Sequence, residues 1–207
     1  MASEQGHYVL DIVSVALLSL ATVTASWCAY QATRWSGEQA AHYNLANGRG
    51  IESTRLEGLA NNQALADLVV FTSWLAAVGA KNTTLQEFYR ARARPEFKPA
   101  LEAWIASRPL HNPRAAPSPF VLPEYRLALR EQSKQLHDES HQLVEKGQIA
   151  NRNGDNYVLA SVLLSAVLFF TGVSQQLRRT RMRMAMLTLG VLLLLAGVIG
   201  LLRLPVA

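Results

Sequence analysis

The residues whose types and spacing come nearest to a chemical site are His137 and His141. Two histidines four residues apart share one face of a helix, which is the spacing of zinc-binding helices. The zinc-protease motif requires glutamate directly after the first histidine, but Asp138 stands there and Glu139 projects from another face. Glu145 follows about one turn later, and the sequence offers no strong third ligand. We therefore interpret both histidines as exposed surface residues, and we expect no metal and no cofactor.

Other catalytic motifs are missing from the sequence. It has no glycine-rich phosphate loop, no Gly-x-Ser-x-Gly elbow and no Cys-x-x-Cys pair. A single cysteine, Cys28, excludes an internal disulfide. The formal net charge is +5, but much of the excess lies at or beyond Arg178, so it indicates topology rather than a nucleic-acid-binding surface. We expect a protein that is not an enzyme and has no nucleic-acid partner.

Three apolar runs are long enough to cross a membrane, at residues 8–27, 157–173 and 184–202. A hydrocarbon core about 30 Å thick needs roughly 20 helical residues. Backbone polar groups cannot remain unpaired in lipid, so each run must be helical. With their interfacial ends, the predicted membrane helices are 8–30, 157–177 and 184–203.

The loop between the second and third runs sets the orientation. It carries four arginines and no acid: Arg178, Arg179, Arg181 and Arg183. Arginine and lysine in short loops favour the cytoplasmic side, so we expect residues 178–183 to form a cytoplasmic turn. The other segments follow by alternation: 1–7 is a cytoplasmic tail, 31–156 is an external domain and 204–207 is an external tail.

A fourth apolar stretch, Ala64–Ala80, is interrupted by Asp67. If it crossed the bilayer, the arginine turn would be placed outside, against the positive-inside bias. We therefore interpret it as a buried helix of the external domain.

The external domain has helical spacing and almost no strand pattern, so the predicted fold class is all-α. Helix is expected through residues 31–78, with a kink at Gly48 and Gly50 because glycine weakens a helix interior. Two short helices, 85–94 and 98–107, should precede a proline-rich crossover at 109–123.

A long helix is expected from Pro123 to Ile149, followed by a turn at 151–156. Its leucines repeat every seven residues at Leu129, Leu136 and Leu143. The complementary heptad positions hold Ser133, Ser140 and Gly147, so the leucines form only half of a coiled-coil seam. We expect this stripe to pack in a helical bundle or against a second copy.

Small residues four apart in the spans predict close helix packing, and self-association is one interpretation. These pairs are Ala21/Ala25, Ser161/Ser165 and Ala196/Gly200. Asp11 lies near the cytoplasmic end of the first span, where an acid can reach the interface.

An aromatic stretch follows the first span, from Trp27 to Gln39. Trp27, Tyr30 and Trp35, with Tyr157 across the domain, suit an aromatic belt at the outer membrane interface. Arg34 lies among these residues, so the alternative interpretation is a site for a lipid headgroup or a partner.

With this stretch, three further pieces resemble a family of uncharacterised bacterial inner-membrane proteins with a domain of unknown function. The pieces are 88–90 with 95–99, 112–125 and 154–158, and Gly48–Gly50 departs from the family pattern. The resemblance implies an inner-membrane setting and a helical external, periplasmic domain, and it brings no catalytic residue with it.

The function predicted from the sequence is a non-enzymatic interaction, scaffold or accessory subunit. Its expected partners are the lipid bilayer and either a second copy or another membrane protein. Two alternatives remain open: a signal-sensing subunit that relays through a partner, and an oligomeric channel or transporter component.

Overall fold

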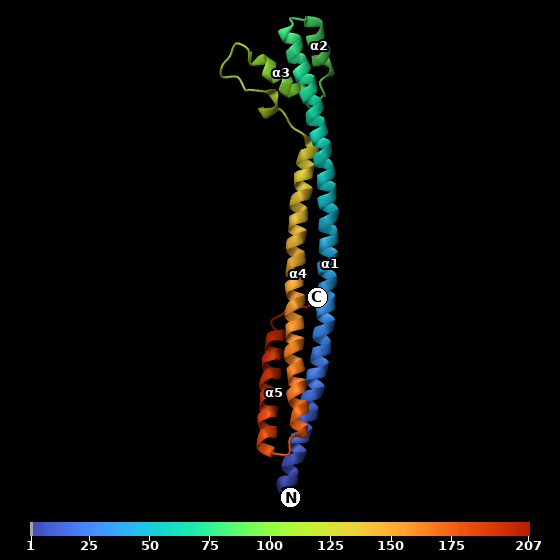
Figure 1. The fold of residues 1–207 in the computed structure, drawn as a ribbon, viewed down its shortest axis with the longest axis vertical. Helices are drawn as coiled ribbons and strands as arrows, with labels where there is room; N and C mark the ends of the chain where they lie inside the picture. The colour runs from blue at the N-terminus through green and yellow to red at the C-terminus, as the bar shows by residue number, and fades with distance from the viewer. Residues whose placement is uncertain (1) are drawn as a thin grey trace. The chain divides into compact units, whose positions relative to one another are not determined.

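The structure is a computed structural model that describes residues 2–207, with side chains from Tyr8 onward. The described residues are 82% helix and contain no strand, which confirms the all-α class. The elements are α1 (Ala2–Gly79), α2 (Thr83–Arg92), α3 (Lys98–Ala106), the 3-10 helix η1 (Pro119–Val121), α4 (Ala128–Gln176) and α5 (Thr180–Leu201) (Figure 1). Of the predicted tail 1–7, residue 1 lies outside the described residues and the others belong to α1.

Three helices, α1, α4 and α5, contain stretches long and apolar enough to cross a membrane. Their number agrees with the three spans expected from the sequence. The chain divides into two compact units. Unit 1 runs up to Leu45 and resumes from Gln142 to Ala207, and unit 2 is Ala46–His141.

The core of unit 1 forms where α4 and α5 approach closely along two glycines of α5. A Cβ on Gly190 would lie 3.2 Å from Thr171 Oγ1, and one on Gly197 would lie 3.6 Å from Leu164. The buried side chains around them are Leu17, Ala21, Cys28, Tyr157, Ala160, Leu164, Val167, Leu187 and Leu194. Ala196 and Gly200, the small pair expected to pack, are exposed. The small residues that α5 presents to α4 are instead Gly190 and Gly197, seven residues apart.

The predicted turn at 151–156 is wrong, because α4 continues through it without a break. A Cβ on Gly154 would lie 3.5 Å from Trp35 Cβ, so the absence of a side chain serves helix contact here. The amide of Asn151 donates to Asp155 one turn later, at 3.0 Å, which supports the helix locally. Packing therefore overrides a composition that is typical of turns.

Small residues lie at the contact between α1 and α4 in unit 2. The Ser53 hydroxyl donates to the Ser133 carbonyl, and the Ser133 hydroxyl donates to the Ser53 carbonyl, both at 2.9 Å. Ser140 donates to the carbonyl of Ala46 at 2.9 Å. Ser133 is buried, whereas Leu136 is only half-buried beside it. The small residues at the complementary heptad positions, such as Ser133 and Ser140, therefore lie at the centre of the α1–α4 contact, and leucines such as Leu136 lie beside it.

Helix α1 runs unbroken through Gly48 and Gly50, since both residues are helical. A Cβ on Gly50 would lie 3.6 Å from Ser140 Oγ, so this glycine admits the neighbouring helix.

An aromatic core closes the far end of unit 2, where α1 packs with α3 and the proline-rich segment. The rings of Phe97 and Phe120 stack with centroids 5.3 Å apart, and Phe71 meets the edge of Trp104 at 5.1 Å. Trp104 Nε1 donates to the carbonyl of Ala116 at 2.7 Å. The 109–123 crossover thus supplies part of the core.

Helix α4 begins at Ala128, five residues later than expected from the sequence. Residues 123–124 instead form a turn, and the irregular residues 125–127 carry Tyr125 toward α1, where its hydroxyl donates to Asp67. This turn and the end of α1 together position the site described next.

Candidate functional site

A buried carboxylate, Asp67, organises the polar centre of unit 2. Only 1% of the residue is exposed. Arg94 donates from Nε and Nη2 to its two oxygens at 2.9 Å each, and the Tyr125 hydroxyl donates to it at 3.1 Å. A bidentate guanidinium pair with a third donor satisfies most of the carboxylate's acceptor positions. The acid that interrupts the apolar sequence is therefore a hydrogen-bonding centre of unit 2.

Two pKa shifts follow from this arrangement. Burial, followed by the neighbouring negative charge of Asp67, raises the pKa of Tyr125 to about 12. The hydrogen bonds to Asp67 raise the pKa of Arg94 above its ordinary value. Both groups therefore keep their protons near neutral pH, and Tyr125 acts as a hydrogen-bond donor.

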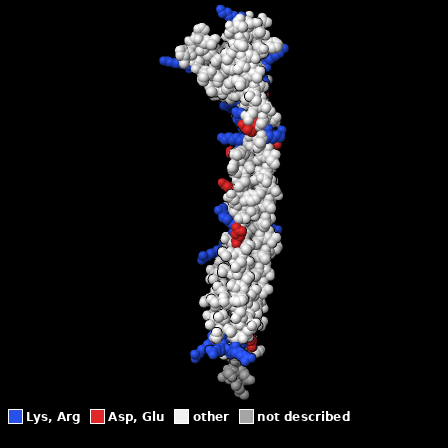
Figure 2. Space-filling model, in the orientation of Figure 1, with Lys and Arg blue, Asp and Glu red and all other residues white. Residues whose placement is uncertain are grey.

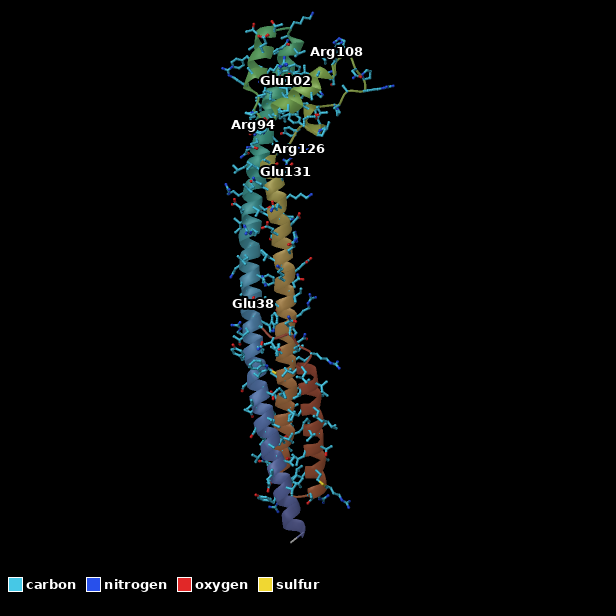
Figure 3. The ribbon with its side chains drawn as sticks, turned by 180° about the vertical axis from the view of Figure 1, so that it is seen from behind. Glu38, Arg94, Glu102, Arg108, Arg126 and Glu131 are labelled. Carbon is cyan, nitrogen blue, oxygen red and sulfur yellow. The ribbon has the colours of Figure 1, made fainter. Side chains whose placement is uncertain are left out.

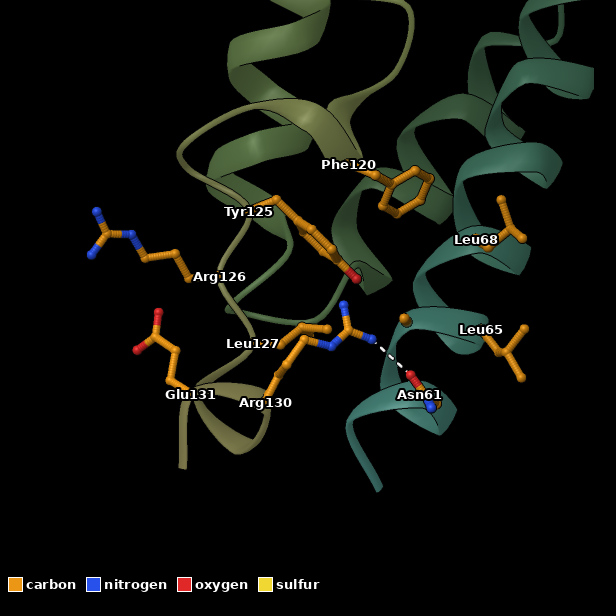
Figure 4. Close-up of a pocket in the computed structure, with 10 residues that line it drawn as sticks. Asn61, Leu65, Leu68, Phe120, Tyr125, Arg126, Leu127, Arg130 and Glu131 are labelled. Carbon is orange, nitrogen blue, oxygen red and sulfur yellow. Dashed lines mark hydrogen bonds between the residues drawn. The ribbon is translucent and has the colours of Figure 1, made fainter. Parts of the chain in front are cut away.

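Beside this polar centre, a groove of about 660 Å³ opens between α1 and the segment that leads into α4 (Figure 4). Leu65, Leu68 and Phe120 give it an apolar wall, and Leu127 lies beneath. Leu65 is 59% exposed and Leu68 is 43% exposed. Neighbouring exposed apolar side chains rimmed by polar residues are a feature of interaction sites.

Charged and polar side chains form the rim of the groove. Arg130 Nη2 donates to Asn61 Oδ1 at 2.7 Å, the bond drawn in Figure 4, and its Nε lies 3.5 Å from Glu57. Arg126 donates to the Pro123 carbonyl at 3.3 Å, and its guanidinium extends outward (Figures 3 and 4). The groove thus pairs an apolar wall with a guanidinium at its edge, which suits recognition of an apolar side chain beside an acid.

His137 and His141 lie on an exposed face of α4, with Nε2 atoms 3.0 Å apart. At this distance one ring donates an N–H to the other, and which ring is the donor depends on the tautomer of each histidine. Among the side chains described from Tyr8 onward, no group of three potential metal ligands comes together.

The structure divides the aromatic stretch that follows the first span. Trp27 and Tyr30 are exposed, with ring centroids 5.8 Å apart, and Arg34 is exposed beside them. Trp35 and Tyr157 instead turn inward to a shared acceptor. The predicted belt residues therefore fall into an outward set and an inward set.

The inward set holds the last residues of the chain. Trp35 Nε1 and the Tyr157 hydroxyl both donate to the carbonyl of Pro205, at 3.2 and 3.1 Å. The backbone N–H of Ala207 donates to Gln31 Oε1 at 3.0 Å, and Gln31 is almost fully buried. Sequence reasoning placed Gln31 in the stretch but missed its role, because its partner lies 176 positions away.

The arginine turn divides in the same way. Arg178, Arg179 and Arg181 are exposed, and Figure 2 shows Lys and Arg gathered at the end of unit 1 where α4 meets α5. Arg183 is buried and pairs with Asp11 of α1. The acid near the end of the first span is therefore half of an ion pair.

Comparison of the chain with protein-family models, curated proteins and solved structures finds no match.

Proposed function

We propose that this chain is a three-span protein of the bacterial inner membrane, with residues 1–7 and the 178–183 turn in the cytoplasm. Residues 31–156 then form a periplasmic helical domain, and 204–207 lie on the same side. Three helices of sufficient length and apolarity support this topology, as do the exposed arginines at the turn. The bacterial setting rests on the family resemblance.

The function we propose is that of a non-enzymatic interaction or accessory subunit. The observation that carries it is the open groove of unit 2. Its apolar wall is exposed, and the guanidinium of Arg126 lies at its rim. The occupant we propose is a segment of another membrane protein that presents an apolar side chain to Leu68 and Phe120. An acidic residue beside that side chain would pair with Arg126.

Single cysteines test the topology. In a Cys28→Ala background, Arg114→Cys in the crossover should react with an impermeant maleimide added to intact cells. Thr180→Cys at the arginine turn should react only after the cells are opened. The reverse pattern would exclude the proposed orientation, whatever the role of the groove.

A photo-crosslinking amino acid at Leu68 tests the groove in the host membrane. We expect one adduct of defined mass, which Arg126→Glu should reduce at least fivefold because it reverses the charge at the rim. The same crosslinker at Lys134, an exposed residue of α4, should give no such adduct. An adduct of equal yield in the Arg126→Glu variant, or no adduct at Leu68, would count against an interaction role for this groove.

A further inference from the structure

The exposed side of α1 in unit 2 has an unusual composition. Among residues 58–79 the only charged residue is Asp67, which is buried against Arg94. Helix faces exposed to water normally carry charges. The exposed residues here are all uncharged: Gly58, Leu59, Asn61, Asn62, Leu65, Ala66, Leu68, Val69, Thr72, Ala76 and Gly79. This face has the composition of a contact surface.

Six of these residues repeat at alternating steps of four and three along the helix. They are Gly58, Asn62, Leu65, Val69, Thr72 and Ala76, here called the outer seam. Steps of four and three are the a/d heptad spacing that keeps one helix against another. The buried residues Asp67, Phe71 and Trp74 lie on the opposite side of α1, so the protomer leaves the outer seam uncovered.

We propose that the outer seam pairs with the outer seam of a second copy in a parallel, two-fold-symmetric contact. This inference rests on the proposed membrane anchoring, because two copies in one bilayer share one orientation. In a two-fold contact each seam residue lies opposite its own equivalent.

The residue types match a parallel two-stranded seam. If Asn62, Val69 and Ala76 take the a positions, then Gly58, Leu65 and Thr72 take the d positions. A β-branched residue at a with leucine at d favours two strands, and a single asparagine at a fixes register. Asn62 would therefore hydrogen-bond to Asn62 of the second copy and align Leu65 with its equivalent.

The seam is about 27 Å long, or about two and a half heptads. A contact this short is weak between free molecules, but shared anchoring in one bilayer raises the effective concentration of the two seams. Pairing should therefore be strong in membranes and diminish on dilution in detergent. A seam without charge also presents no repulsion between identical faces.

Cysteine crosslinking in native membranes tests the pairing. In the full-length Cys28→Ala background, single cysteines replace each seam residue in turn, and Lys134→Cys on α4 is the control. Disulfides need Cα atoms within about 7 Å. We expect seam positions to give a species of twice 22.8 kDa at least fivefold more often than Leu59→Cys, Ala66→Cys or the control.

A charge placed in the seam provides a second test. Val69→Lys should lower crosslinking through Asn62→Cys at least tenfold, because two lysines would oppose each other. Val69 is 63% exposed in the protomer, so thermal unfolding of the variant should match the parent. Lys134→Glu should leave crosslinking unchanged.

Three results would overturn the proposal. Equal crosslinking at seam and flanking positions would exclude a seam. Adducts of another mass would mean that a foreign protein covers it. Protection from aqueous maleimide without crosslinking would mean that lipid covers it. Arg114→Cys labelling from outside reports the topology separately, so failure of the pairing is distinguishable from failure of the proposed function.

Discussion

Arg94 donates two parallel hydrogen bonds of 2.9 Å to the carboxylate of Asp67, although the two residues are 27 positions apart in the chain. The pair joins α1 to the short segment between α2 and α3. Because Asp67 is buried and Arg94 is only partly exposed, the pair fixes this end of unit 2 with a geometry that few other contacts could provide.

Replacing Asp67 with Ala should destabilise the protein by about 2–4 kcal/mol, because the substitution leaves Arg94 and the Tyr125 hydroxyl without their acceptor. Thermal unfolding of the purified full-length protein measures the effect. Arg55→Gln is the matched control, since its pair with Glu52 is exposed on both sides and its loss should change stability little. Similar losses in the two variants would contradict the central role of Asp67.

Alkaline pH should weaken unit 2 through Tyr125. Its pKa is about 12 in the folded protein and near 10 when unfolded, so folding favours the protonated phenol. The stability contributed by this preference is present below pH 10 and is lost as the pH rises through 12. Tyr125→Phe is less stable at pH 8 because it lacks the bond to Asp67. The difference in unfolding free energy between the parent and Tyr125→Phe should narrow from pH 10 to 12. Melting curves across that range measure it, and a constant difference would mean that ionisation of the phenol does not affect stability.

The reciprocal bonds between Ser53 and Ser133 predict energetic coupling between α1 and α4. Each hydroxyl donates to the other residue's carbonyl, so either Ser→Ala substitution removes one of two bonds that close a ring. We expect each substitution to cost about 1 kcal/mol and the double-mutant cycle to show coupling above 0.5 kcal/mol. Strict additivity in chemical unfolding would mean that the two bonds form independently.

The general fold followed from the sequence because hydrophobic spacing and span length are local properties. Helix class, three apolar runs and the short pair of helices before α4 all depend on such patterns. The centre of the α1–α4 contact did not follow, because serine and glycine at Ser133, Ser140 and Gly147 look unfavourable in a leucine heptad. Only the second helix shows that small residues there allow close approach and backbone hydrogen bonds.

Gly147→Ala should destabilise unit 1, because a Cβ there would lie 2.5 Å from Cε1 of the Tyr43 ring. Moving that ring aside should cost about 1–3 kcal/mol, more than the helix propensity that alanine gains. Gly37→Ala is the control on α1, since nothing lies within 4 Å of its added Cβ, and it should raise stability by up to about 1 kcal/mol. Opposite shifts in melting temperature are expected, and shifts of the same sign would contradict the close approach.

Orientation should depend on the three exposed arginines of the turn. Replacing Arg178, Arg179 and Arg181 with Gln removes positive charge from the loop while the Arg183 pair with Asp11 remains. We expect mixed orientation, so that the impermeant maleimide labels Thr180→Cys in a fraction of the protein molecules of intact cells. Replacing three exposed basic residues of the 31–156 segment, Arg114, Lys134 and Arg152, removes equal charge and should leave the labelling pattern unchanged.

The candidate site was harder to predict than the fold, because its parts are far apart in sequence. Asp67 looked like an interruption of an apolar run, and only Arg94 and Tyr125 show why a carboxylate is tolerated there. Arg130 reaches Asn61 across 69 positions, which no local pattern indicates. One signal was available in the sequence: an acid alone among apolar residues requires a buried partner, and Arg94 stands between two short helices.

In the proposed topology, Asp67 also influences how many segments remain in the bilayer during synthesis. As residues 64–80 leave the ribosome, the translocon must choose between inserting them and passing them through. An aspartate at the centre of an inserted helix costs about 2.5–3.5 kcal/mol, and Asp67, three residues from the start of this stretch, adds a smaller penalty of the same sign. Arg94 is 27 residues behind, so the carboxylate meets this decision before its partner has emerged. One side chain thus first favours translocation of residues 64–80 and later anchors the folded domain. Its loss would favour a fourth span, which would reverse the orientation of the later segments, and it would also destabilise the fold.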